Sequence, residues 1–120
     1  MEASKRYLDY LESIFEVEPL LFMNNSKVPD LPGVASLVFK DIPEPGYVTG
    51  FSYGLSLYNN HNWIKGRPEL CITVKSEDIM WGRVAGIIAN EYRGILDFSY
   101  GDRFDSDFKI LSSKMTAYFI

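Results

Sequence analysis

The sequence predicts an α+β fold, in which helices pack on a mostly antiparallel sheet of about five strands. Two observations give this class: some segments repeat apolar residues with the period of two that strands show, and others with the three- and four-residue spacing of helices. The third observation is composition. With 120 residues, 47% hydrophobic and 15% aromatic, the chain is long and apolar enough for a single domain, 1–120, with its own core.

The first element is expected to be an amphipathic helix at residues 4–15. Its apolar face consists of Tyr7, Leu8, Leu11, Ile14 and Phe15. Its polar face carries Asp9 and Glu12, whereas a helix that lies on a membrane surface has a basic polar face. We therefore expect this helix to dock on the core of the domain.

Two strands are expected next, separated by an irregular connection. The apolar run at residues 20–23 can form a short strand, and the polar residues 24–26 then indicate a turn. Prolines favour an extended connection up to Gly33. Residues 34–40 are rich in β-branched and aromatic side chains, which favour a strand, and the proline-containing loop 41–46 follows it.

The strand at residues 47–58 has the clearest pattern, because one side carries large residues and the other carries small ones. Gly50 and Gly54 lie on the small side, and glycines inside a strand indicate a bulge or close packing against that side. Two interpretations stay open: a helix of the same chain covers the small side, or a partner chain or ligand does. A loop at 59–66 then leads into an antiparallel neighbouring strand.

The next unit is a strand at residues 69–75 that runs directly into a helix at residues 76–93, and we expect the sheet to be organised around it. We expect this strand to be the central one. The serine that begins the helix can cap it, and Gly94 can end it. Gly82 and Gly86 each cost a helix about 1 kcal/mol relative to alanine, so we expect them to allow a close approach to the sheet.

A final strand is expected at residues 115–120. The chain ends there in the middle of apolar sequence, so we expect the domain to continue beyond Ile120. No internal repeat or low-complexity segment divides the chain, which agrees with one domain.

The sequence carries no strong signature of catalysis or of cofactor binding. One histidine, His61, and one cysteine, Cys71, are too few for a typical zinc site, and phosphate-binding glycine motifs are absent. A Cys71–His61 pair could serve a small hydrolytic or ligand-binding domain in the cleft between strand and helix. However, a cysteine within a strand lacks the helix N-terminus that lowers a thiol pKa. We expect no catalytic residue, no cofactor and no metal.

An acidic segment follows the second helix. It carries Asp97, Asp102, Asp105 and Asp107, with only Arg103 against them. The spacing lacks the central glycine and the closing glutamate of an EF-hand, so a solvated acidic surface is the simpler interpretation. Such a surface suits a basic protein partner, and the net charge of −4 disfavours nucleic acid.

The sequence indicates neither a membrane span nor a secretion signal. No apolar run approaches the roughly 18–20 residues that cross a bilayer, and the N-terminus is charged and amphipathic. The single cysteine agrees with a reducing compartment. We therefore expect a cytoplasmic protein.

The order of elements resembles the suppressor-of-fused-like domain, specifically its bacterial members. The resemblance covers residues 34–120. It rests on Thr49–Gly50, on Gly54–Leu55–Ser56, on the segment from Arg67 to Thr73, on Trp81 early in the helix, and on Gly101–Asp102 before the last strand. In that family a glutamate opens the central strand, and Glu69 matches that position here.

This resemblance implies a non-enzymatic protein-binding domain. Animal members of the family sequester a transcription-factor peptide by completing a sheet with it, and many bacterial members look like immunity proteins, or antitoxins, of polymorphic toxin systems. The expected partner is then a basic toxin domain that is neutralised by direct binding. The surfaces expected to bind it are the small side of the 47–58 strand and the acidic segment. The individual candidates are Tyr53, Asp97, Asp102, Asp105 and Asp107.

Overall fold

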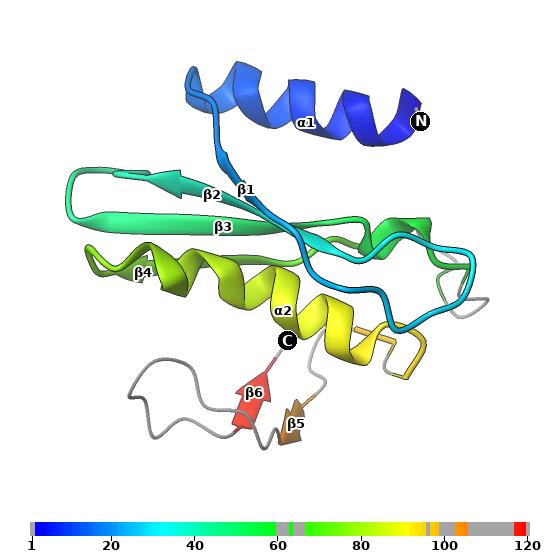
Figure 1. Cartoon of the computed structure of the whole chain (residues 1–120). Helices are drawn as coiled ribbons and strands as arrows, with labels where there is room; N and C mark the ends of the chain where they lie inside the picture. The colour runs from blue at the N-terminus through cyan, green and yellow to red at the C-terminus, as the bar shows by residue number, and fades with distance from the viewer. Residues whose placement is uncertain are drawn as a thin grey trace.

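The computed structural model describes residues 2–59, 63, 67–95, 97–98, 103–105 and 117–119, without the side chains of 2–4, 103–105 and 117–119. Figure 1 shows how the elements are arranged. In chain order they are α1 (Glu2–Phe15), β1 (Leu20–Phe22), β2 (Ala35–Lys40), β3 (Tyr47–Tyr53), η1 (Leu55–Leu57), β4 (Cys71–Lys75), η2 (Ile79–Arg83), α2 (Val84–Tyr92), β5 (Arg103–Asp105) and β6 (Ala117–Phe119). The elements η1 and η2 are short 3₁₀ helices.

The sheet confirms the α+β class, but it has four strands where about five were expected. The strand order is β1-β2-β3-β4, and every neighbouring pair is antiparallel. The strand expected at the end of the chain is present as β6, yet it pairs with β5 in a separate two-stranded sheet. The number of strands in the main sheet is lower than expected because β6 forms its backbone hydrogen bonds with β5.

The position expected for the 69–75 strand is wrong, because β4 lies at an edge of the four-stranded sheet. The two inner strands are β2 and β3. Cys71, Thr73 and Lys75, which alternate along β4, are all exposed. Alternation of this kind indicates that one side of the strand is covered. Edge strands and central strands can both have one covered side, so the pattern does not distinguish between them.

Helices cover both sides of the sheet, so the domain has three layers, with α1 on one side and η2 and α2 on the other (Figure 1). Under α1, Leu11 packs against Leu37 and Phe39. The ring of Phe15 lies 4.8 Å from that of Phe39. These contacts confirm that the first helix docks on the core, although Ile14 on its expected apolar face stays 51% exposed.

The second layer approaches the sheet through glycines, as expected. A methyl group built on Gly50 would overlap the carbonyl of Gly82, and one built on Gly86 would overlap the hydroxyl of Ser36. The small side of β3 is therefore covered by the chain's own helices η2 and α2. The interpretation that a partner or ligand occupies this side is wrong, because no space is left there.

The strand expected at residues 47–58 ends early, at Tyr53. Gly54 adopts a φ of 123°, which side-chain-bearing residues rarely reach, and the chain turns there into η1. The large and small residues continue to alternate beyond Gly54, so the pattern alone does not reveal the turn.

The helix expected at residues 76–93 begins as the 3₁₀ helix η2 and becomes α-helical only at Val84. Asp78 caps it by accepting a hydrogen bond from the Met80 amide at 3.0 Å. Ser76, the expected cap, accepts one from the Asp78 amide instead, at 3.0 Å. Gly94 follows the helix with a φ of 86°, as expected for the residue that ends it.

The close contact between Gly50 and Gly82 predicts a large cost for adding one methyl group. We expect Gly50→Ala to lower the free energy of unfolding by about 3 kcal/mol. The added methyl group would overlap the backbone carbonyl of Gly82, and neither β3 nor η2 can move away without disturbing its own packing. Urea unfolding followed by circular dichroism measures this.

The matched control is Gly46→Ala, because nothing lies within 4 Å of a Cβ at Gly46 and its positive φ is the main source of cost, about 1 kcal/mol. An equal loss in the two variants would contradict the close packing of β3 and η2.

Candidate functional site

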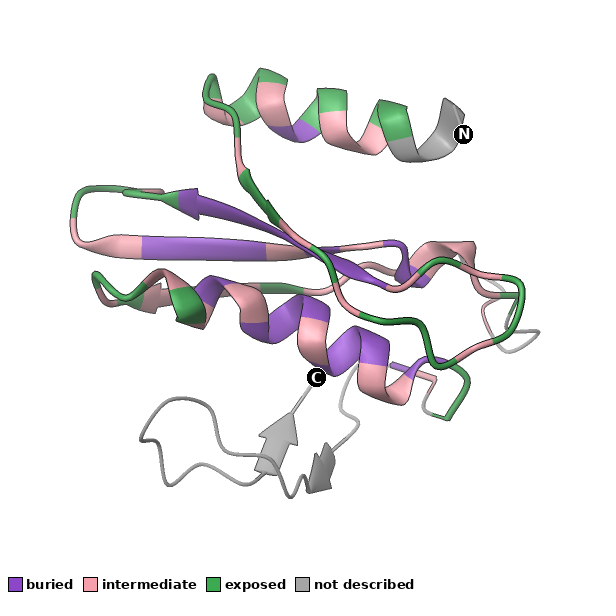
Figure 2. Ribbon diagram, viewed as in Figure 1, coloured by how far each residue is buried: buried purple, intermediate pink, exposed green. Residues whose placement is uncertain are grey.

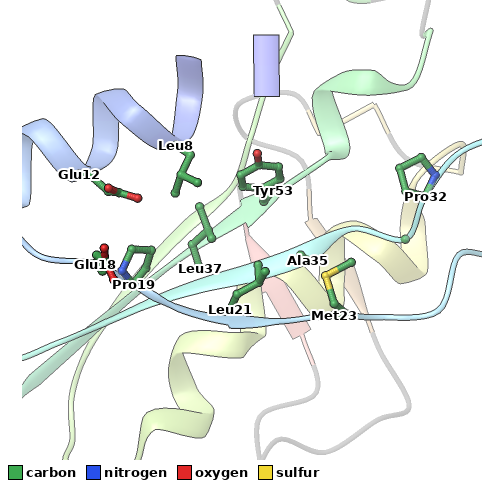
Figure 3. A pocket seen from close by; sticks show the side chains of 11 residues that line it. Leu8, Glu12, Glu18, Pro19, Leu21, Met23, Pro32, Ala35, Leu37 and Tyr53 are labelled. Carbon is green, nitrogen blue, oxygen red and sulfur yellow. The ribbon is translucent and has the colours of Figure 1, made fainter. Parts of the chain in front are cut away.

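A groove of about 450 Å³ lies between α1 and β1, and we call it the α1–β1 groove (Figure 3). Its floor includes Leu21 of β1 and Leu37 of β2, which face each other across the two strands. Tyr53 of β3 adds an aromatic ring to the groove. Leu8 and Glu12 of α1 line it from the helix side. The remaining lining residues are Glu18, Pro19, Met23, Pro32, Gly33 and Ala35.

The groove exists because the described core under α1 draws on β2 and β3 and not on β1. Leu21 and Met23, which line the groove, therefore keep exposed fractions of 58% and 62%. Figure 2 shows the contrast between the buried inner strands and the exposed chain around β1. Apolar surface gathered in one place on a folded protein typically marks a binding region.

The charged residues that line the groove are both acidic. Glu12 comes from α1 and Glu18 from the link between α1 and β1. Within the described part of the chain, neither carboxylate takes part in a hydrogen bond or an ion pair. The site is therefore an apolar groove with unpaired negative charge, which is suited to an apolar group that carries a cation.

The structure places Tyr53 in the groove and Asp97 on the other side of the sheet. Asp97 follows α2, and its carbonyl accepts a 2.7 Å hydrogen bond from the indole of Trp63, which packs on the core beneath α2. Asp105 lies in β5, while Asp102 and Asp107 lie outside the described residues. Of the candidates with described side chains, Tyr53 therefore lies on the α1 side of the sheet and Asp97 near the core under α2, and the role of all five in partner binding stays a prediction.

Cys71 is a poor nucleophile in this environment. It is exposed on β4, yet partial burial of its sulfur raises the pKa of the thiol, and a hydrogen bond with Thr73 offsets only part of that rise. A reactive cysteine needs a lowered pKa. Cys71 also pairs with Phe51, whose side chain faces α1, so it points away from the cleft between β4 and α2. His61 lies outside the described residues.

Metal binding has no support within the described residues, where no group of three or more His, Cys, Asp or Glu side chains is arranged to hold an ion. The carboxylate with the most partners is instead Glu69, which lies just before β4. It accepts bonds from the hydroxyls of Ser52 and Ser56, both at 2.6 Å. It also accepts three backbone amides, those of Gly54, Leu55 and Ser56, each at 3.1 Å.

The five bonds to Glu69 make it a structural residue, because its oxygens have no capacity left for a substrate. They satisfy the amides at the start of η1, which a helix of this length leaves without internal partners. The pattern of helices and strands in the sequence does not reveal the role of Glu69, because its carboxylate bonds to residues more than ten positions away.

Arg93 and Asn90 extend this polar network to the end of α2. Arg93 is buried and donates to the carbonyls of Gly54 at 3.3 Å and Pro32 at 2.8 Å. Burial lowers the pKa of its guanidinium, and Glu69 nearby opposes that effect. The side-chain Oδ1 of Asn90 accepts a hydrogen bond from the backbone amide of Val34 at 2.9 Å. These contacts fix the chain before β2, which forms the far end of the α1–β1 groove.

Tyr7 connects α1 to the same network. Its hydroxyl donates to the Ser52 carbonyl at 3.0 Å, and its ring stands edge-on to Tyr53 at 5.8 Å between centroids. Burial, with additional effects from Glu69 and Cys71, raises the pKa of the phenol far above its usual value. The phenol therefore stays protonated and keeps donating, which holds α1 beside the groove.

Comparison with known protein families, with curated proteins and with solved structures finds no match to this chain. Among the described helices, none has the length and apolar character needed to cross a membrane.

The Glu69 network predicts a large loss of stability on removing its charge. We expect Glu69→Gln to lower the free energy of unfolding by about 3 kcal/mol, because an amide nitrogen cannot accept the donors that one carboxylate oxygen now satisfies. Chemical denaturation measures this against Glu44→Gln, an exposed glutamate in the 41–46 loop. Equal stability of the two variants would show that the five bonds contribute little.

The raised pKa of Cys71 predicts slow alkylation. At neutral pH the folded protein should react with iodoacetamide several-fold more slowly than the same chain in denaturant, because less thiolate is present. The rate should rise as the pH approaches and passes the raised pKa. A folded protein that reacts faster than the denatured chain would instead return Cys71 to the list of candidate nucleophiles.

Proposed function

We propose that this chain is a non-enzymatic protein-binding domain of the suppressor-of-fused-like type. Its activity is that of a bacterial immunity protein, or antitoxin, which neutralises a cognate toxin in the cytoplasm by direct binding. The observation that carries the proposal is the concentration of exposed apolar surface beside the α1–β1 groove. No such surface is needed by a domain that only has to fold.

The exposed apolar residues are unevenly distributed along the chain. Of the eight large hydrophobic residues exposed in the described part, six lie between Tyr10 and Met23. They belong to α1, the link after it, and the chain in and around β1. This concentration along the chain, with Leu21 and Met23 lining the groove, supports an interaction with a protein, because exposed apolar residues that gather at a groove are less usual than scattered ones.

The edge of the sheet at β1 supports the same proposal. Among the described strands, β1 pairs only with β2, so its outer backbone edge is open. The three residues of β1 are all apolar, whereas β4 at the opposite edge carries Lys75. Charged residues on an edge strand discourage pairing with other chains, and β1 has none. An added strand from a partner therefore fits β1 better than β4.

The acidic segment is the second surface of the proposal. Asp97, Asp102, Asp105 and Asp107, together with the net charge of −4, suit a basic toxin domain. Complementary charge accelerates the encounter of two proteins and weakens as salt screens it.

The proposal predicts one stoichiometric, basic protein partner. Full-length protein should capture it from the native host lysate, its gene should lie beside the gene for this chain, and it should stop growth when expressed alone. Co-expression of this chain should restore growth. Calorimetry should show an affinity that falls about tenfold or more between low and high salt.

Leu21→Ser should impair rescue and Met80→Ser should not, because both side chains are exposed but only Leu21 lies in the groove. A small molecule that co-purifies without any protein partner would contradict the immunity proposal. Affinity that does not change with salt would contradict the acidic recognition surface.

A further inference from the structure

The α1–β1 groove combines an apolar floor with a negatively charged end. Leu21, Leu37 and Tyr53 supply the apolar part. Glu12 and Glu18 both lie toward the end of the groove away from Pro32 (Figure 3). The two ends of the groove are therefore chemically different, so that it can orient an occupant as well as hold it.

The carboxylates select the charge of that occupant. Among the described residues, no lysine or arginine lines the groove, and neither Glu12 nor Glu18 has an ion pair. An anionic occupant would meet two like charges with nothing to compensate them. A cation at this end of the groove gains charge-assisted hydrogen bonds to these carboxylates beside an apolar floor.

The surroundings indicate a polypeptide as the occupant. Outside the groove, Ile14 and Val17, which are close in the chain to the lining residues Glu12 and Glu18, are also about half exposed. A small amine could fill the groove but would leave that surface uncovered. A polypeptide covers both, with one side chain inside and its neighbours across the apolar rim.

A second copy of this chain fits less well. A two-fold symmetric contact places the same surface against itself. Glu12 and Glu18 would then face Glu12 and Glu18 of the other copy, between molecules that each carry a net charge of −4. The repulsion makes a basic partner the better match.

We infer that the α1–β1 groove is the recognition site for a partner segment in which an apolar side chain stands next to a lysine or arginine. The apolar side chain packs on Leu21 and Leu37, and the cation lies between Glu12 and Glu18. This inference rests on the proposed function, because it states which part of the partner the domain recognises. It distinguishes the groove from the acidic segment after α2.

The test is selection from a random-sequence peptide library displayed on phage, with the folded full-length chain as bait. Selected peptides should contain an apolar residue beside lysine or arginine. Synthetic versions should shift the backbone amide signals of Leu8, Leu21 and Leu37 in nitrogen-15 spectra. The double variant Glu12→Gln, Glu18→Gln should bind them about tenfold more weakly.

A matched double variant, Glu44→Gln with Glu77→Gln, removes the same charge from two exposed positions outside the groove and should bind as the parent does. Selected peptides without basic residues, or signals that shift only around Asp97, would overturn the inference. So would a sedimentation experiment in which the chain is a dimer that Leu21→Ser dissociates.

The selection also separates this inference from the proposed function. If a cognate partner is captured and rescue of growth survives Glu12→Gln with Glu18→Gln, the domain binds a toxin but not through the groove. If peptides enter the groove and no toxin exists, the groove is a recognition site in a protein with another role.

Discussion

The rest of this fold depends on the hydrogen bonds that the carboxylate of Glu69 accepts from the start of η1. The strand β3 ends at Tyr53, and the chain must leave the sheet, form a short 3₁₀ helix and return as β4. Five hydrogen bonds to one carboxylate make that reversal possible without leaving buried amides unpaired. The same reversal places Gly54 where Arg93 holds it, and thereby connects the sheet to the end of α2.

Much of the fold was predictable because it is encoded locally. Alternation in β3 identified its two sides, and glycines at positions 82 and 86 indicated close packing that the structure shows against Gly50 and Ser36. The features that were not predictable depend on residues far apart in the sequence. The end of β3 requires the Glu69 network, and the edge position of β4 requires knowing which strands lie beyond it.

The candidate site was less predictable than the fold. Tyr53, one of the predicted partner-binding residues, lines the groove, but its role in binding stays a prediction, and the acidic residues grouped with it lie elsewhere or outside the described chain. The helical pattern places Glu12 on the polar face of the first helix and gives no sign that it lines a groove. A groove forms where two elements fail to cover each other, and hydrophobic periodicity describes each element separately. The uncovered apolar run at residues 20–23 was the one local sign of it.

The width of the groove is set by residues that no ligand would touch. Leu11 and Phe15 determine how α1 rests on Phe39, and Tyr7 fixes the helix through its bond to Ser52. A change of volume at any of these buried positions tilts or lifts α1, and so moves one wall of the groove relative to β1. Substitutions at these positions can therefore reshape the groove while every residue that lines it remains the same.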